Sequence, residues 1–535
     1  MTTTSATFDL TTETWIPVVD LRGEQQEVSL GEAFSRAHKL RRIVGETPPM
    51  TAALYRLLLA VLHRAYGPAD RRAWATLWKA DHFPAGPLST YFSDCAERFD
   101  LFHPVTPFLQ CPGLSLVPGR SSVAKLVPHK SVGNNVTLFD HTTAGDQLNL
   151  SPAAAARWLV TTHAFDPGGM KTPYKKDKSS ERAPCATIGV TVVEGATLKD
   201  TLLLNALAYE PEAERPTGMT TPADAPAWEV EPPSPEPVTR PARGWTDLLT
   251  WPSRRILLFP HHIGHDVHVS QVVLAPGTRL KDDLHEVELQ AAFRKPPDPK
   301  GTPQRDAPML PVRLHPVRGI WRFSVELLLV DVYAEERTRQ RPYTLKQIAD
   351  LVEHGIIPAD TIYTLRVFGQ QLDSKASVVE AYLEDEVPAP VALIRATDGE
   401  LAGLIGCAIE FADETGAALR AMQRAYLKDL RAQPTGDIDV GYWPHLARPF
   451  AEFLRAVSTA RLAGLSESPA VDNWARHVKK VAVRASERWA AGNSAQLRNL
   501  SMIGKHQGEF LRRLGSQQRL LHSKITAYLT KDEDT

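Results

Sequence analysis

The chain contains little cysteine, and its cysteines are not placed in pairs. Among 535 residues there are four, scattered at Cys95, Cys111, Cys185 and Cys407. Because no two of them form a CxxC spacing, the sequence has neither a disulfide framework nor a thiolate zinc motif. This cysteine usage suits a reducing compartment, so we expect a cytoplasmic protein.

The sequence also lacks long apolar runs and has almost no net charge. No stretch approaches the roughly 18 apolar residues of a membrane-spanning helix, and the first residues lack the basic-then-apolar order of a signal peptide. We therefore expect neither export nor a membrane partner. The 61 Lys and Arg against 62 Asp and Glu leave a formal net charge of −1. Such a balance argues against a protein that coats nucleic acid over its whole surface, so any nucleic-acid surface must be local.

Short catalytic signatures are absent as well: there is no Walker A loop, GxGxxG, GxSxG elbow or HExxH. We therefore expect a protein that is not an enzyme and carries no cofactor. The histidines from His261 to His268 are the best candidates for metal ligands, since spacings of three and four residues can place imidazoles around zinc. The segment lies between two strand-like runs and contains Gly264-His265-Asp266, so we interpret it as a solvated hairpin tip without metal.

The first part of the chain combines strand and helix signals. Strand-like residues around Trp15 and a turn glycine, Gly23, predict a β-hairpin. Ser29 and Glu32 form the pattern of a helix capping box. Apolar residues of Met50–Tyr66 repeat at three and four residues, which indicates a helix with a buried face. Further strand-like runs lie at 255–259, 267–274 and 319–332.

Three stretches have the composition of irregular connections. Residues 118–147 hold several Gly and Asn without periodicity, and 165–184 holds five basic residues against three acidic ones. Connections of this length are usually functional or disordered. Residues 211–241 contain nine prolines and many acids, so we expect a long exposed connection there.

From about residue 386 the pattern changes to long helices. Helical periodicity covers Val391–Met422, Pro449–Leu465, Val471–Ala491 and Ser494–Leu529. Four such helices at the end of a chain predict an antiparallel bundle. The predicted fold class is therefore α+β: a large mixed α/β N-terminal domain with long loops over 1–385, and a C-terminal four-helix bundle over 386–535.

The last helices carry a regular row of positive charge. Arg476, Lys480, Arg484 and Arg488 recur every four residues and so form one slowly drifting stripe on a helix. Residues 471–530 hold 11 Lys and Arg but only 3 Asp and Glu. A solvated helix face usually mixes the two signs, so this pattern favours contact with nucleic-acid phosphates, with a merely solvated face as the alternative.

Several segments also follow one another in an order that carries a family resemblance. They are FDLTTETWIPV near the start, then HPVTPFLQ, NNVTLFDHT, the Gly168-Gly169 turn, LKDTLLLNAL, LTWPSRRILL and GQQLDSKASVVE, followed by the four helices. Together they cover nearly the whole chain. In this order they resemble the CasA family, the large subunit of the type I-E CRISPR Cascade surveillance complex.

The resemblance implies a division of labour between protein and RNA. A guide RNA held by other Cascade subunits reads the target by base pairing, while the large subunit recognises a short flanking motif in double-stranded DNA, the PAM, and starts strand separation and R-loop formation. It also implies that the large subunit helps to recruit the helicase-nuclease of the CRISPR system. In the family the PAM is read mainly from the minor groove, whose hydrogen-bonding code is degenerate.

The family's DNA-contacting positions transfer to particular residues. Leu138, Phe139 and Asp140 fall on the first DNA-contacting loop, although an amide rather than Asp140 is usual there. Gly168 and Gly169 fall on the glycine-rich loop that approaches the groove edge.

For two further features of the family, the basic finger and the wedge, more than one residue of this chain is a candidate. Arg279 and Lys281 are the two candidates for a basic finger. Lys375 falls where the family has a glutamine wedge at the tip of a hairpin, with Gln370 and Gln371 nearby.

Two other classes of function remain open from the residues. The runner-up is a non-catalytic scaffold or interaction protein whose helical bundle docks other proteins. The third is a metal-dependent hydrolase that uses the histidines of 261–268.

Overall fold

The structure is a computed structural model, and it describes most of the chain. The described residues are 6–116, 119–128, 148–174, 177–216, 219–296, 304, 306–330, 338–397, 399–430, 437–493 and 497–529. Packing divides the chain into two compact units: Met1–Ala291 with Arg366–Glu384, and Ala292–Leu365 with Asp385–Thr535. The domain limits predicted at 385 and 386 lie beside the change of unit after Glu384, and they stay a prediction.

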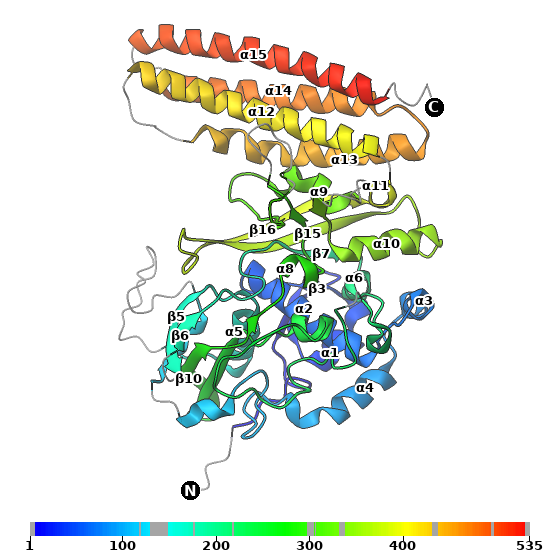
Figure 1. The fold of residues 1–535 in the computed structure, drawn as a ribbon, viewed down its shortest axis with the longest axis vertical. Helices are drawn as coiled ribbons and strands as arrows, with labels where there is room; N and C mark the ends of the chain where they lie inside the picture. Colours follow the sequence, from blue (N-terminus) through cyan, green and yellow to red (C-terminus); the bar gives the residue numbers. More distant parts are fainter. Residues whose placement is uncertain are drawn as a thin grey trace. The chain divides into compact units, whose positions relative to one another are not determined.

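Helix α2 (Pro48–Ala65) lies in the middle of the first unit (Figure 1). Thr47 caps its N-terminus and a proline occupies its first turn, as expected for a helix start. It packs against α4 (Ala85–Asp94), α5 (Pro152–Phe165), α6 (Leu198–Asn205) and α7 (Trp245–Leu249). Because neighbours surround it, all of its residues from Pro49 to His63 are buried, which is more than the single face that its periodicity predicted.

The predicted N-terminal hairpin is confirmed. Strands β1 (Ile16–Asp20) and β2 (Gln25–Val28) pair antiparallel, and β3 (Leu40–Ile43) joins the other edge of β1. The capping box of Ser29 and Glu32 is also present, at the start of α1 (Leu30–Ser35). These elements form from near neighbours in sequence, which explains why local patterns were sufficient to predict them.

Two hairpins of the first unit frame the candidate site. The first is β5 (Gly169–Tyr174) with β6 (Asp177–Ser180), and the second is β9 (Arg254–Ile263) with β10 (Asp266–Pro276). Strand β4 (Ser121–Ser122) pairs with β10. The remaining elements here are α3 (Arg71–Lys79), α8 (Leu284–Val287), β7 (Val190–Glu194), and the parallel pair β8 (Thr239–Arg240) and β11 (Arg279–Leu280).

The longest hairpin consists of β15 (Ile362–Leu372) and β16 (Val379–Pro390), in a sheet of order β16-β15-β7. Its residues Arg366–Glu384, which include the tip, belong to the first unit. Buried Arg366 bonds to Glu194 of β7 at 3.1 Å and also pairs with Glu384 of β16. This charge network holds the middle of the hairpin on β7 and so fixes where its tip emerges.

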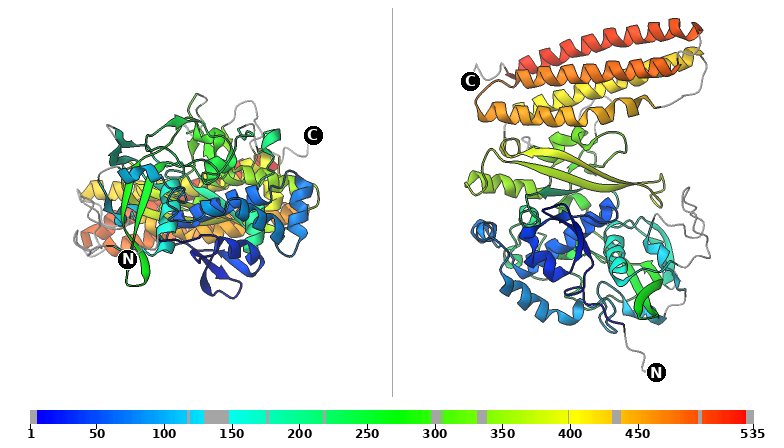
Figure 2. Two further views of the ribbon diagram at one scale, coloured as in Figure 1. Left: turned by 90° about the horizontal axis from the view of Figure 1, so that it is seen from below. Right: turned by 180° about the vertical axis from the view of Figure 1, so that it is seen from behind.

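The second unit contains the predicted bundle. Its helices are α12 (Gly399–Leu430), α13 (Ala447–Leu462), α14 (Ser468–Asn493) and α15 (Leu497–Leu529), and they run side by side (Figures 1 and 2). Rings pack at one end of it, where Phe450 lies 4.7 Å from Trp321 and 5.2 Å from Trp474 between ring centroids. The first predicted helix is broken, because α11 (Val391–Arg395) ends before α12 begins.

The described part of the second unit also contains a small sheet of three very short strands and, after it, a helix that precedes the β15–β16 hairpin. The strands are β12 (Phe293–Arg294), β13 (Leu310–Pro311) and β14 (Arg339–Gln340), and the helix is α10 (Tyr343–Glu353).

Two sequence-based expectations are wrong. Over 319–330, the described part of the strand expected at 319–332, the chain instead forms a 3-10 turn (Ile320–Phe323) and α9 (Ser324–Leu328), with buried residues at helical spacing. The connection expected to be exposed over 211–241 carries buried Trp228, whose ring lies 5.4 Å from Phe99. In the first case composition obscured a helical period. In the second, Trp228 and buried Asp224, together with the ion pair of Glu229 and Arg64, hold a proline-rich chain onto the core.

Candidate nucleic-acid interface

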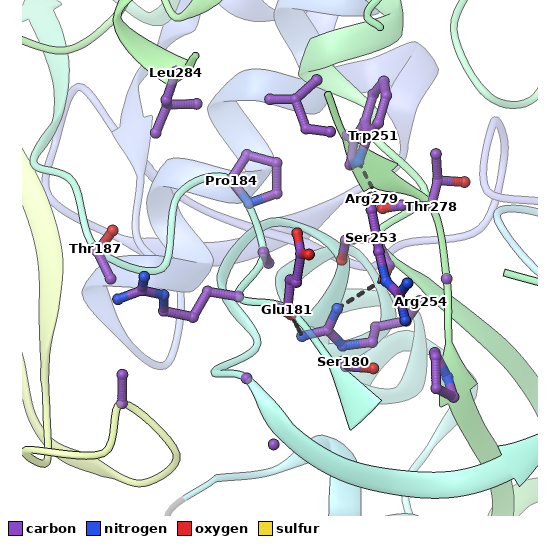
Figure 3. Close-up of a pocket in the computed structure, with 18 of the residues that line it drawn as sticks. Ser180, Glu181, Pro184, Thr187, Trp251, Ser253, Arg254, Thr278, Arg279 and Leu284 are labelled. Atoms are coloured by element: carbon purple, nitrogen blue, oxygen red, sulfur yellow. Dashed lines mark hydrogen bonds between the residues drawn. The ribbon is translucent and has the colours of Figure 1, made fainter. Parts of the chain in front are cut away.

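A hollow of about 680 Å³ opens in the first unit beside the β5–β6 hairpin. Residues from parts of the chain far apart in sequence form its wall: 168–169, 180–184, 187, 251, 253–254, 276–280, 282, 284 and 374–376. The polar and glycine residues of the wall that matter below are Gly168, Gly169, Arg182, Arg254, Arg279 and Lys375. Figure 3 shows Glu181, Arg254 and Arg279 side by side in it. The hollow therefore brings together four positions that were predicted from separate motifs: Gly168, Gly169, Arg279 and Lys375.

The glycine pair lies at the start of β5, with Gly168 just before the strand and Gly169 as its first residue, and each glycine is required for a different reason. Gly169 has φ +110°, in the left-handed region that side chains rarely adopt. A Cβ added at Gly168 would lie 3.2 Å from the carbonyl oxygen of Ser180, which is tighter than ordinary contact. The two positions therefore present bare backbone to the hollow, with no side chain between the peptide edge and a ligand.

Buried Arg254 holds the two ends of the β5–β6 hairpin together. Its Nε lies 2.6 Å from Oδ2 of Asp166, and its Nη2 donates to the carbonyl oxygen of Glu181 at 2.7 Å. Lys171 adds a second cation 2.7 Å from the same Asp166 oxygen. Since Arg254 and Asp166 are both buried, this pair satisfies charges that could not stay unpaired there. The network fixes the chain before Gly168 and after Ser180.

Sequence reasoning did not assign Arg254. A signal was present, because two adjacent arginines, Arg254 and Arg255, begin an otherwise apolar strand-like run, and an arginine inside a buried strand needs a partner. What the sequence could not supply was the partner, Asp166, which lies 88 positions earlier.

The tip of the β15–β16 hairpin reaches the hollow through Ser374, Lys375 and Ala376. The Asp373 carboxylate accepts hydrogen bonds from the backbone N–H groups of Ser377 at 2.7 Å, Val378 at 2.8 Å and Lys375 at 3.2 Å. The hydrogen bonds from the N–H groups of Val378 and Ser377, of which that from Val378 has the larger effect, hold the pKa of Asp373 below its usual value. The turn is thus tied to one carboxylate, and the side chain of Lys375 is carried on a defined loop.

Gln370 and Gln371 are placed differently from Lys375. The Gln370 side chain donates to the carbonyl oxygen of Phe165 at 2.7 Å, and the Gln371 side chain donates to Oε2 of Glu380 at 2.7 Å across the hairpin. Among the described residues that form the wall of the hollow, neither glutamine is present. Lys375 is therefore the member of this predicted group that the structure brings to the hollow.

The two candidates for the basic finger also differ. Arg279 lines the hollow, and its Nη2 donates to the carbonyl oxygen of Ser179 at 3.4 Å. Lys281 follows β11, where its backbone N–H donates to the carbonyl oxygen of Arg240 at 3.0 Å, and it is not among the described wall residues. Leu138, Phe139 and Asp140 lie outside the described residues.

The predicted cationic row lies on α14. Arg476, Lys480, Arg484 and Arg488 are all exposed. Arg488 lies 3.3 Å from Nε2 of His445, while Lys480 and Arg484 have no ion-pair partner among the described residues. The row therefore offers positive charge that acids of the described bundle do not neutralise.

The histidine segment forms the turn of the β9–β10 hairpin, as predicted, with Gly264 at φ +63°. His261 and His268 face each other across the strands with ring centroids 6.4 Å apart. Within the described part of the chain, one group of three possible metal ligands comes together, and it is a different one: Asp350, Glu353 and His354, at the end of α10.

Among the helices that the structure describes, none has the length and apolarity to span a membrane.

Comparison with known proteins gives one consistent family. The family model described as CRISPR-associated protein Cse1 matches residues 9–485. A curated relative, CRISPR-associated protein CasA/Cse1 of Thermus thermophilus, is 31% identical over 96% of this chain and 99% of its own length.

Solved structures agree with this. The crystal structure of Thermobifida fusca Cse1 is 28% identical, covers 97% of this chain and 99% of that chain, and has a TM-score of 0.78. A chain of a solved CRISPR RNA-guided surveillance complex, 21% identical and covering 94% of this chain and 99% of its own, shares the fold with a TM-score of 0.71.

Proposed function

This chain belongs to the CRISPR-associated Cse1 (CasA) family, and we propose that it is the PAM-reading large subunit of a type I-E Cascade complex. In this role guide RNA and the other Cascade subunits pair with the target strand, while this chain recognises the PAM in double-stranded DNA. It then promotes local strand separation and R-loop formation, and it helps to recruit the helicase-nuclease. The chain itself is non-catalytic in this proposal.

One observation carries the proposal: the hollow that gathers the glycine pair, Arg279 and Lys375 from segments remote in the sequence. These are three of the features that the family resemblance assigns to motif reading and strand opening. A bare peptide edge can approach the floor of a DNA groove because no Cβ intervenes. Arg279 belongs to the same wall, so we assign it rather than Lys281 as the basic finger.

The chemistry of the edge suits a groove with a degenerate code. Backbone groups at Gly168 and Gly169 offer single donors and acceptors rather than the bidentate fork of a side chain. In the minor groove both A·T and T·A present only acceptor atoms, while G·C adds one donor. Such an edge distinguishes few base pairs, so several PAM sequences are tolerated. We further propose that Phe139, with Leu138 and Asp140, contacts the same DNA.

Strand opening is assigned to the hairpin tip. Separating one base-pair step costs about 1 to 2 kcal/mol of stacking, which an inserted side chain can offset only if its backbone is held in place. The carboxylate of Asp373 supplies that restraint through its hydrogen bonds to the turn. Lys375 then occupies the vacated space and its ammonium group contacts phosphate, while Gln370 and Gln371 support the strand beneath it.

The α14 row has a separate part in the proposal. Arg476, Lys480, Arg484 and Arg488 bind the DNA backbone without reading sequence, because phosphate contacts are the same at every base.

The test is reconstitution of the complex with guide RNA and with or without this subunit, followed by binding to a randomised PAM library. We expect motif-dependent binding only when the subunit is present, and we expect Gly168→Asp and Phe139→Ala to weaken it. If both variants bind motif-containing and motif-free duplex like wild type, the site assignment is wrong. If the complex without the subunit keeps full motif dependence, the chain is a scaffold instead.

A further inference from the structure

Arg182 is an exposed arginine in the wall of the hollow to which no role has been given so far. It lies in the basic 165–184 segment, two residues after the end of β6. Neither a hydrogen-bond partner nor an ion-pair partner for its guanidinium is present among the described residues. No acid of the described fold therefore neutralises its charge, whereas the nearby Arg254 is paired with Asp166.

The backbone that carries Arg182 is fixed on both sides. The carbonyl oxygen of Glu181 accepts from Nη2 of Arg254 at 2.7 Å, and the N–H of Ala183 donates to the carbonyl oxygen of Asp166 at 3.0 Å. Both anchors lead to the same buried ion pair of Arg254 and Asp166. Arg182 is thus mounted rigidly, even though its side chain reaches solvent.

The stem of Arg182 lies against the glycine pair. A Cβ added at Gly168 would lie 3.4 Å from Cγ of Arg182, whereas a Cβ added at Gly169 would lie 3.7 Å from Cβ of Ser377 in the hairpin turn. The bare dipeptide is therefore backed by Arg182 at one residue and by the Lys375-bearing turn at the next. Each of these two neighbours brings one cationic side chain, Arg182 or Lys375, to the wall of the hollow.

A DNA groove has the matching geometry. Its floor presents base edges, and a phosphate backbone bounds it on each side. A peptide edge that enters the groove brings the side chains on its two flanks next to those backbones. An unpaired guanidinium is suited to that position because its planar donors bind phosphate oxygens bidentately.

We propose that Arg182 binds a backbone phosphate at the rim of the groove that Gly168 and Gly169 enter. This inference rests on the proposed function, since it concerns the same DNA. It adds a contact that positions the duplex and reads no base.

The experiment uses the reconstituted complex with Arg182→Gln, Arg182→Lys and a matched control, Arg72→Gln. Arg72 lies on α3, is exposed like Arg182, belongs to the same unit and is not part of the described wall. Affinity for a target duplex is measured over a salt series, and preference is measured on the randomised PAM library.

For Arg182→Gln we expect the slope of log affinity against log salt to become shallower by about 0.9, with roughly five- to tenfold weaker binding near 0.1 M salt. The ranking of PAM sequences stays unchanged, because a phosphate contact is blind to sequence. Arg182→Lys keeps the salt slope, since the charge remains, and loses only part of the affinity. Arg72→Gln behaves like wild type.

Two outcomes overturn the inference while leaving the proposed function in place. One is a wild-type salt slope in Arg182→Gln, and the other is a changed PAM ranking, which would mean that Arg182 reads a base. If wild-type complex shows no motif dependence at all, the proposed function fails and the role of Arg182 falls with it.

Discussion

Removing three charges from α14 should change how DNA binding responds to salt. Arg476 and Arg488 are 12 residues apart, and a helix rises by about 1.5 Å per residue, so the row spans roughly 18 Å. Along that length one strand of a duplex carries about five phosphates, enough to meet every cation of the row. The perturbation is the triple variant Arg476→Gln, Lys480→Gln and Arg484→Gln, whose three side chains are all exposed.

The size of the effect follows from counterion release. Each phosphate contact contributes about −0.9 to the slope of log affinity against log salt for a duplex, and about −0.7 for a single strand. Loss of three contacts makes the slope shallower by about 2.7 for a duplex or 2.1 for a single strand. Between 50 and 200 mM salt, wild-type binding should therefore fall about 40-fold or 20-fold further than binding of the variant.

The assay is fluorescence anisotropy of the reconstituted complex on a labelled target duplex over that salt range. The matched control removes three charges from other faces of the same bundle, with Arg424→Gln, Arg448→Gln and Arg455→Gln, all of which are exposed. Both triple variants should unfold at the wild-type temperature. A wild-type slope in the α14 variant, or an equal change in the control, would refute the assignment of this row to DNA.

Three further predictions concern the first unit. Gly169→Ala places a side chain at φ +110°, which costs about 1 to 2 kcal/mol, and should weaken motif-dependent binding of the complex. Arg254→Ala leaves buried Asp166 with Lys171 as its remaining cation and removes the donor to the carbonyl oxygen of Glu181, so it should lower the free energy of unfolding by about 1 to 3 kcal/mol, measured by urea denaturation. Burial lowers the pKa of His63 to about 4. Between pH 6.5 and 4 this imidazole therefore binds a proton in the unfolded chain but not in the folded one, and the free energy of unfolding decreases as the pH is lowered. From pH 7 to pH 5 wild type should lose about 2 kcal/mol more than His63→Gln.

Each of these has a control. Gly23 also has a positive φ, +91°, with open space around it, so Gly23→Ala should cost stability without affecting DNA binding, and equal loss of binding in both variants would contradict the Gly169 assignment. Adding Lys171→Ala to Arg254→Ala should lower stability further, since Asp166 then has neither cation, and no further loss would argue against the pairing of Asp166 as the cause. For His63, whose Nε2 accepts from the N–H of Leu207, parallel pH curves of wild type and variant would exclude its titration.

Local features of this fold could be predicted because their causes lie within a few residues of one another. The capping box at Ser29, the β-hairpin around Gly23 and the four long helices all follow from patterns that one turn of helix or one β-turn can satisfy. The charge row on α14 belongs to the same class, since a spacing of four residues places side chains on one stripe in any helix. Where composition and period disagreed, as over 319–332, the sequence-based prediction failed.

The hollow could not be derived in that way. It joins residues near 168, 254, 279 and 375, and which of them share a wall depends on long-range packing rather than on local preference. Motif order indicated that the glycine pair and Lys375 matter, but not that a Cβ at Gly169 would lie 3.7 Å from the hairpin turn, or that Arg182 lies beside Gly168.

Sequence alone determined the N-terminal hairpin, the capping box at Ser29, the long C-terminal helices and the charge row, because those depend on near neighbours. Tertiary structure decided that Arg254 pairs with a buried carboxylate, whereas Arg182 remains able to bind a ligand. The physical reason is that pairing of a charge depends on where a partner 88 positions away folds, as Asp166 does for Arg254.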